Sequence, residues 1–185
     1  MAVNLPAEER RALWEAVAPL RASGAPVRWA AEPNLHITLR FLGEVADDQA
    51  APIGEALAVA VRGAKAFDLG LGGVGAFPDF AAPRVLWIGV ERHPALELLA
   101  NDVEGALRPF GFEPELRPFQ PHLTVGRARE DARGGDALRE LEQLAAALDY
   151  SGVIPVEALD LMVSRHRSGG PVYQSLHRAA LGGGR

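Results

Sequence analysis

The sequence predicts an α+β protein of two similar lobes, each an antiparallel sheet backed by outer helices, with approximate two-fold symmetry around a central cleft. Three observations support this prediction. The order helix, motif strand, helix, strand, strand occurs twice along the 185 residues. Each half contains one His-x-Thr tripeptide. The hydrophobic fraction of 48% is ordinary for a globular chain, which is long enough to bury a core of its own.

The first half is expected to begin with a helix, because apolar residues recur at helical spacing after Pro6 and acidic residues lie near the start. A short strand then precedes the first motif, and a second helix and two strands follow it. The expected ranges are a helix over 6–22, a strand over 27–30, a helix over 47–62, strands over 67–74 and 84–90, and a loop over 75–83.

The second half repeats this order after a lobe boundary near residue 93. The expected ranges are a helix over 94–107, a strand at the second motif, a helix over 136–149, strands over 156–164 and 172–180, and a hairpin turn over 168–171. Residues 1–181 are expected to form one domain. The glycine-rich stretch 182–185 is expected to be a disordered tail.

The two motifs, His36-Ile37-Thr38 and His122-Leu123-Thr124, contain the only two threonines of the chain. Both follow a segment that contains proline, and both continue into apolar residues. Side chains at positions i and i+2 of a strand point to the same face, so each histidine shares a face with its threonine. If the two strands lie near each other, two imidazoles and two hydroxyls converge.

Composition excludes several classes of protein. The chain has no cysteine, which rules out disulfides, thiolate nucleophiles and cysteine zinc sites, and fits a reducing compartment. A net charge of −5 argues against a broad basic surface for nucleic acid, so phosphate binding should be local. Charged residues interrupt the N-terminus, and no uncharged apolar run approaches the roughly 18 residues of a membrane span. We expect a cytoplasmic protein with no membrane contact.

The residues around the motifs resemble a known family. Residues 34–44 and 121–127 look like the paired HxTx signatures of the two-histidine phosphoesterase superfamily, and the match is closest to the RNA 2′,3′-cyclic phosphodiesterases, also called LigT-like proteins or 2′-5′ RNA ligases. The resemblance extends through 72–78, 83–90 and 161–165, but residues 1–6 are shorter than the family's usual opening strand. It implies a bilobal fold with the motifs facing across a cleft. It also implies hydrolysis of a terminal 2′,3′-cyclic phosphate of RNA to a 2′-phosphate.

The motif residues suit this chemistry independently of the resemblance. Opening a cyclic phosphodiester requires a base that deprotonates water and an acid that protonates the departing ribose oxygen, placed for in-line attack. Histidine can supply both forms near neutral pH. By resemblance, His36 is the proton donor and His122 the proton acceptor, while Thr38 and Thr124 bind the phosphate oxygens.

The family pattern also implies that Arg127 neutralises charge in the transition state. Its parity on an ideal strand is wrong for this role, so its participation requires a bulge or a strand end, which Gly126 permits. Arg40, Arg84 and Trp87 are further candidates for substrate contacts, although a structural role is favoured for each of them. The remaining histidines, His93, His166 and His177, lack this context and are not expected to be catalytic.

Motifs that the sequence lacks argue against two other classes of hydrolase. A zinc hydrolase is disfavoured because the sequence has no H-E-x-x-H motif and no cysteine, and a serine hydrolase because it has no G-x-S-x-G elbow. Ligation through a 2′-5′ bond and a non-catalytic RNA- or nucleotide-binding module remain as alternatives. No metal or cofactor is expected. The expected partner is RNA or a nucleotide ending in a 2′,3′-cyclic phosphate, and the chain is expected to act as a monomer without a protein partner.

Overall fold

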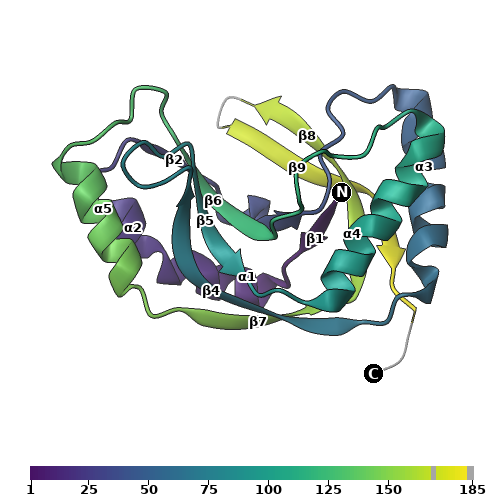
Figure 1. Ribbon diagram of the computed structural model, residues 1–185, viewed down its shortest axis with the longest axis horizontal. Helices are drawn as coiled ribbons and strands as arrows, with labels where there is room; N and C mark the ends of the chain where they lie inside the picture. The colour runs from purple at the N-terminus through teal and green to yellow at the C-terminus, as the bar shows by residue number, and fades with distance from the viewer. Residues whose placement is uncertain (168–169, 183–185) are drawn as a thin grey trace.

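The computed structural model describes residues 1–167 and 170–182 and shows a single curled sheet flanked by helices (Figure 1). Its strand order is β7-β4-β5-β6-β3-β1-β8-β9, and β2 also pairs with β6. Neighbouring strands in this sheet are antiparallel. The α+β class is therefore confirmed. The two expected sheets are joined edge to edge through β3 and β6, the strands that carry the motifs.

The secondary-structure elements lie close to the ranges expected from the sequence. The strands are β1 (Ala2–Asn4), β2 (Val27–Trp29), β3 (His36–Thr38), β4 (Phe67–Phe77), β5 (Val85–Val90), β6 (His122–Ala128), β7 (Ser151–Val156), β8 (Ala158–Arg167) and β9 (Gly170–Ala180). The α-helices are α1 (Ala7–Ala16), α2 (Ala18–Ala22), α3 (Asp47–Ala60), α4 (Pro94–Leu107) and α5 (Asp136–Ala147). Short 3₁₀ helices are η1 (Glu32–Asn34), η2 (Val61–Gly63) and η3 (Arg108–Phe110).

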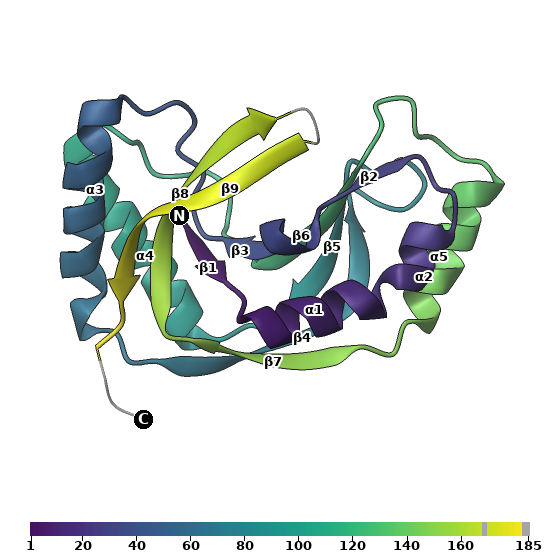
Figure 2. The same cartoon turned by 180° about the vertical axis from the view of Figure 1, so that it is seen from behind.

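The helices lie at the two ends and on the back of the sheet. α3 and α4 pack against each other at one end, while α5 and α2 pack together at the other (Figure 1). α1 contacts β7 and is seen in front in the reverse view (Figure 2). α5 turns Leu138, Leu141 and Ala145 inward at the spacing of one helical face. This arrangement leaves the faces of β3 and β6 that carry the motif histidines clear of the helix-packed core.

The halves of the sheet do not correspond to the halves of the sequence. One half, β3-β1-β8-β9, takes strands from both chain ends, and the other half contains β4 to β7. The lobe boundary expected near residue 93 falls between β5 and α4, and the strands on both sides of it, β5 and β6, lie in the same half of the sheet. The two chain ends meet in the other half because β1 pairs with both β3 and β8, so that Ala2 lies opposite Thr38 and Asp160. The order of strands along a chain does not by itself specify which strands pair.

Four details differ from the sequence-based prediction. The expected first helix is divided at Val17, and Pro19 lies in the first turn of α2, where its missing N–H is tolerated. The opening strand is present as β1 and is internal to the sheet. β4 extends into the expected loop as far as Phe77. β7 is a separate strand that the sequence pattern did not predict, and as an edge strand it accommodates Pro155.

The C-terminal segment is attached to the body of the chain up to Gly182. Leu181 is buried, and Gly182 forms a parallel bridge with Lys65. The expected tail therefore does not begin at Gly182, and residues 183–185 lie outside the described residues, as does part of the expected 168–171 turn. Among the described residues, the helices are all too short or too polar to cross a membrane.

Candidate active site

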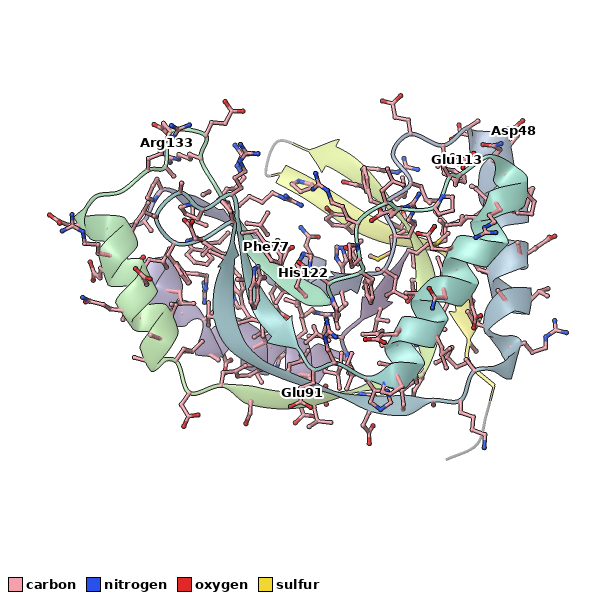
Figure 3. All side chains as sticks on the ribbon, in the orientation of Figure 1. Asp48, Phe77, Glu91, Glu113, His122 and Arg133 are labelled. Atoms are coloured by element: carbon pink, nitrogen blue, oxygen red, sulfur yellow. The ribbon has the colours of Figure 1, made fainter. Side chains whose placement is uncertain are left out.

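The two His-x-Thr motifs lie side by side on adjacent strands. β3 and β6 pair at Ile37 and Leu123, whose side chains are fully buried in the core. Alternation along each strand places the flanking histidines and threonines on the opposite face. The antiparallel register sets His36 beside Thr124 and Thr38 beside His122. The motifs therefore form a square on one continuous surface, whereas the sequence suggested two strands facing each other across a cleft. Figure 3 shows His122 near the centre of the molecule.

Both histidine rings are held by the same backbone contact. Nδ1 of His36 lies 2.7 Å from the carbonyl oxygen of Asn34, and Nδ1 of His122 lies 2.8 Å from that of Gln120. A carbonyl oxygen only accepts hydrogen bonds, so Nδ1 carries the proton in both neutral rings. Each Nε2 is then left to accept a proton when the ring is neutral or to donate one when it is charged.

An aromatic ring also packs against each histidine. Tyr173 of β9 contacts His36 edge-on with 4.7 Å between ring centroids, and Phe77 of β4 contacts His122 edge-on at 5.1 Å. Figure 3 shows Phe77 beside His122. Neither ring is predicted to be part of the site from the sequence alone. Neither position lies near a motif in the sequence, and only the strand pairing brings them together.

The two histidines differ in their surroundings. Burial lowers the pKa of His36 below its usual value, and the hydrogen bond to Asn34 opposes this shift. Asn34 also connects the first motif to β9: its side-chain amide donates to the carbonyl of Pro171 at 2.7 Å, and its side-chain oxygen accepts from the backbone N–H of Tyr173 at 3.5 Å. Gln120, the corresponding residue before His122, is exposed. The first half-site is therefore more enclosed than the second.

A bulge in β6 determines where Arg127 lies. β5 residues Leu86 and Trp87 pair with Gly126 and Thr124, so β6 has one extra residue between its partners. Val125 and Gly126 are both buried, and Arg127 is exposed. The bulge shifts the alternation by one residue and places Arg127 on the same face as Thr124. This is the irregularity that the sequence parity required for an arginine in the site.

Trp87 lies on β5, and Arg84 lies just before the first residue of this strand. Trp87 pairs with Thr124 on the site face, and its ring packs 5.2 Å from Phe77. A Cβ at Gly75 would lie 2.1 Å from the indole, so the absence of a side chain there lets the ring lie against the sheet. The indole nitrogen of Trp87 is buried and has no hydrogen-bond partner among the described residues. Arg84 is exposed at the start of this strand.

Arg40 is neither solvated nor free. It is 9% exposed, and its guanidinium lies 3.1 Å from a carboxylate oxygen of Glu104 and 2.9 Å from one of Glu115. It also donates to the carbonyl of Glu113 at 2.6 Å. These contacts attach the end of the first motif to α4 and to the segment that leads toward the second motif. They account for Arg40 without a substrate.

The other histidines have structural surroundings where they are described. His93 accepts a hydrogen bond from the backbone N–H of Ala95 at the start of α4 and stacks on Phe67. His177 packs against Gly54 of α3. The side chain of His166 lies outside the described residues. Among the described side chains, no group of three or more His, Asp or Glu is arranged to hold a metal ion.

Comparison with known sequences connects this chain to one family. Residues 10–167 match the 2′-5′ RNA ligase superfamily. A protein of Aeropyrum pernix named RNA 2′,3′-cyclic phosphodiesterase is 38% identical over 84% of this chain and 86% of its own. A protein of the same name from Thermotoga maritima is 30% identical over 100% of this chain and 95% of its own.

Solved structures give the same result. A crystal structure of a Thermus thermophilus protein superposes with a TM-score of 0.77 at 28% identity, covering 100% of this chain and 97% of the other. E. coli LigT complexed with 3′-AMP superposes with a TM-score of 0.72 at 30% identity, covering 97% and 95%. The resemblance drawn from the two motifs is confirmed, and the chain belongs to the 2′-5′ RNA ligase superfamily.

Proposed function

We propose that this protein hydrolyses the terminal 2′,3′-cyclic phosphate of RNA to a 2′-phosphomonoester without a metal ion. One observation carries the proposal: two imidazoles on paired strands each have Nδ1 bonded to a backbone carbonyl, which leaves both Nε2 atoms for proton transfer. The names of the relatives from Aeropyrum pernix and Thermotoga maritima support the same substrate.

The reaction needs one proton transfer at each side of phosphorus. A neutral histidine accepts a proton from water as the water oxygen bonds to phosphorus, and a protonated histidine donates to the ribose 3′ oxygen as its bond to phosphorus breaks. The product carries a 2′-phosphate and a 3′-hydroxyl. Thr38 and Thr124, whose hydroxyls have no partner among the described residues, bind the non-bridging oxygens, and Arg127 neutralises the developing charge.

His36 is assigned as the proton donor and His122 as the acceptor. Burial lowers the pKa of His36, which favours its neutral form in the free protein and works against a donor role. The donor assignment therefore requires the anionic substrate to raise the pKa of His36 when it binds, as an adjacent negative charge does. If the substrate does not have this effect, the roles of the two histidines are exchanged while the chemistry stays the same.

Two other functions use the same site. Ligation through a 2′-5′ bond opens the same cyclic phosphate with the 5′-hydroxyl of a second RNA in place of water, so the same base and acid serve it and the 3′ oxygen is again the leaving group, but abundant water favours hydrolysis. A non-catalytic binding module would need hydrogen-bond donors for phosphate but not two histidines with matched tautomers. Solved structures of E. coli LigT with 3′-AMP and with phosphate support nucleotide phosphates as ligands of such a site.

Product analysis tests the proposal directly. The protein is incubated, in the presence of EDTA, with an RNA oligonucleotide that ends in a 2′,3′-cyclic phosphate, and the products are separated from 2′- and 3′-phosphate standards. We expect complete conversion to the 2′-phosphate. Tight binding without conversion would favour a binding module instead, and conversion that EDTA abolishes would contradict a metal-independent reaction.

We further propose that the protein acts as a monomer in the cytoplasm. A dimer in solution, measured by light scattering, would contradict the monomeric state.

A further inference from the structure

Two arginines lie directly opposite each other beside the proposed site. β2 pairs with β6 on the same edge as β3, farther along the strand, and its Arg28 is the register partner of Arg127. Directly opposed residues in an antiparallel pair point to the same face, with Cβ atoms about 5 Å apart. Both arginines are exposed. Arg28 therefore shares the face to which the β6 bulge brings Arg127.

This pair is unfavourable unless something binds to it. Like charges directly opposite on neighbouring strands destabilise a sheet. The protein has 24 acidic residues and a net charge of −5, yet neither arginine forms an ion pair with a carboxylate in the described part of the chain. Arg40, which follows the first motif, is by contrast neutralised by Glu104 and Glu115. An anion between Arg28 and Arg127 would replace their repulsion with two attractive contacts.

The position of Arg28 and Arg127 indicates which anion binds between them. The reactive phosphate belongs over the square of histidines and threonines, which is centred on the paired residues Ile37 and Leu123. The backbone of Arg127 lies on the order of 10 Å farther along β6 by the rise of a strand, a distance that its long side chain spans when it reaches back to the reactive phosphate. Arg28, opposite it on β2, suits a neighbouring phosphate of the same RNA strand, which Arg127 shares through its remaining N–H groups.

We propose that Arg28, together with Arg127, binds the phosphodiester on the 5′ side of the terminal nucleotide, so that the site selects the end of an RNA chain over a free nucleoside 2′,3′-cyclic phosphate. This inference rests on the proposed function. Guanidinium groups are suited to phosphate because they donate in a planar, bidentate arrangement. A mononucleotide cyclic phosphate has no 5′ phosphodiester and cannot make this contact.

Substrate selectivity of Arg28→Ala tests the inference. kcat/KM is measured for a short RNA ending in a 2′,3′-cyclic phosphate and for the matching nucleoside 2′,3′-cyclic phosphate. We expect the ratio of the two values to fall about tenfold through a higher KM for the RNA, and the salt dependence of log(kcat/KM) for RNA to lose about one unit of slope. Arg28→Lys should restore part of the loss. Arg11→Ala, an exposed arginine on α1, is the matched control and should leave the ratio unchanged.

The outcomes distinguish this inference from the proposed function. If Arg28→Ala leaves the ratio of the two kcat/KM values unchanged, the Arg28 subsite is overturned while the proposed hydrolysis stands. If the wild-type protein hydrolyses neither substrate, the subsite is tested instead by the binding of the same RNA ending in a 2′-phosphate. Binding that is weakened by Arg28→Ala but not by Arg11→Ala would support the phosphate subsite even though the protein is not an enzyme, and equal binding by the wild type and both variants would rule the subsite out.

Thermal unfolding should show that Arg28→Ala is at least as stable as wild type, because the mutation relieves repulsion; a lower melting temperature would contradict the unfavourable pairing.

Discussion

The two half-sites have the same local geometry but different surroundings. In both, a strand places histidine and threonine on one face, a carbonyl two residues earlier binds Nδ1, and an aromatic ring packs against the imidazole. His36 is nevertheless the more enclosed ring, and Asn34 connects it to β9, whereas Gln120 before His122 is exposed. A repeated tripeptide thus reproduces the backbone contact, and the tertiary structure makes the two copies unequal.

The arginine after each motif shows this inequality most clearly. Arg40 follows Thr38 and is buried in an ion-paired network with two glutamates. Arg127 follows Thr124 across a bulge and is exposed without a described carboxylate partner. The first arginine belongs to the packed fold, and the second is the one that we propose binds an anion. The first half-site is accordingly the more enclosed part of the surface and the second is the more exposed part.

The largest expected effect tests what the half-sites share. His36→Ala and His122→Ala should each lower kcat for cyclic phosphate hydrolysis by about a thousandfold, because each removes a proton-transfer group. Both variants should keep the far-ultraviolet circular dichroism of the wild type, since the rings lie on the face away from the core. Near-wild-type turnover in either variant would remove the two-histidine mechanism.

Substitution of the two threonines tests whether the half-sites are equivalent, with a smaller expected loss of activity. Thr38→Val and Thr124→Val keep the shape of the side chain and remove the hydroxyl, so each should cost about 1–3 kcal/mol of transition-state stabilisation, measured from kcat/KM. Similar losses would mean that both hydroxyls bind the phosphate. If only one variant is impaired, the two half-sites do not bind the phosphate equivalently.

The arginines should separate stability from activity. Arg40→Met leaves Glu104 without its partner and should lower the free energy of unfolding by about 2 kcal/mol, less than for a fully buried pair because Glu115 is half exposed. Arg127→Met should not lower the free energy of unfolding, because it removes the repulsion between Arg127 and Arg28, but it should lower kcat/KM. Urea denaturation and kinetics on both variants measure this contrast. Arg139→Ala, which removes an exposed pair with Asp136, is the control and should change neither quantity.

Asn34 and Gln120 compare the supports of the two histidines. Asn34→Ala removes two side-chain hydrogen bonds to β9 and should lower the free energy of unfolding by about 1 kcal/mol, with a lower kcat because His36 is less firmly placed. Gln120→Ala keeps the backbone carbonyl that binds His122 and should behave as wild type in both assays. Equal effects in the two variants would mean that the enclosure of the first half-site has no consequence for function.

The smallest expected effect concerns pH. Burial lowers the pKa of His36 in the folded protein, so below about 6.5 the unfolded chain binds more protons than the folded one. Stability should therefore fall as the pH drops below about 6.5, and this loss should be smaller in His36→Gln. Urea midpoints at about pH 7.5 and about pH 5.5 for both proteins test it. Identical pH dependence would show that burial of His36 is not linked to stability.

Much of the site could be predicted because it depends on local geometry. The parity of the His-x-Thr strands follows from the alternation of side chains, and the helix over 94–107 follows from Pro94 and an amphipathic pattern. Likewise, the parity of Arg127 is wrong for an ideal strand, so the role that the resemblance implies for it required a bulge or a strand end, and β6 does have a bulge opposite Leu86 and Trp87.

The rest depends on long-range pairing, which the sequence pattern does not encode. Nothing near the motifs indicates that Tyr173 and Phe77 contact the histidines, or that β1 lies between β3 and β8. Arg40 has the parity of a site residue, and only the fold reveals the two glutamates beside it. Arg28 likewise gains meaning only from its register with Arg127.

The interleaving of distant strands has a consequence for how the protein is made. A ribosome that has translated as far as α4 has released β3 and its first motif, but neither β6, which carries the second, nor β8, which completes the sheet around β1. Contacts between segments so far apart in the chain form late, and they lower the folding rate. The nascent chain thus carries one histidine of the pair with an unpaired strand edge beside it. Activity should appear only when nearly the whole chain has left the ribosome, and prematurely terminated products should be inert.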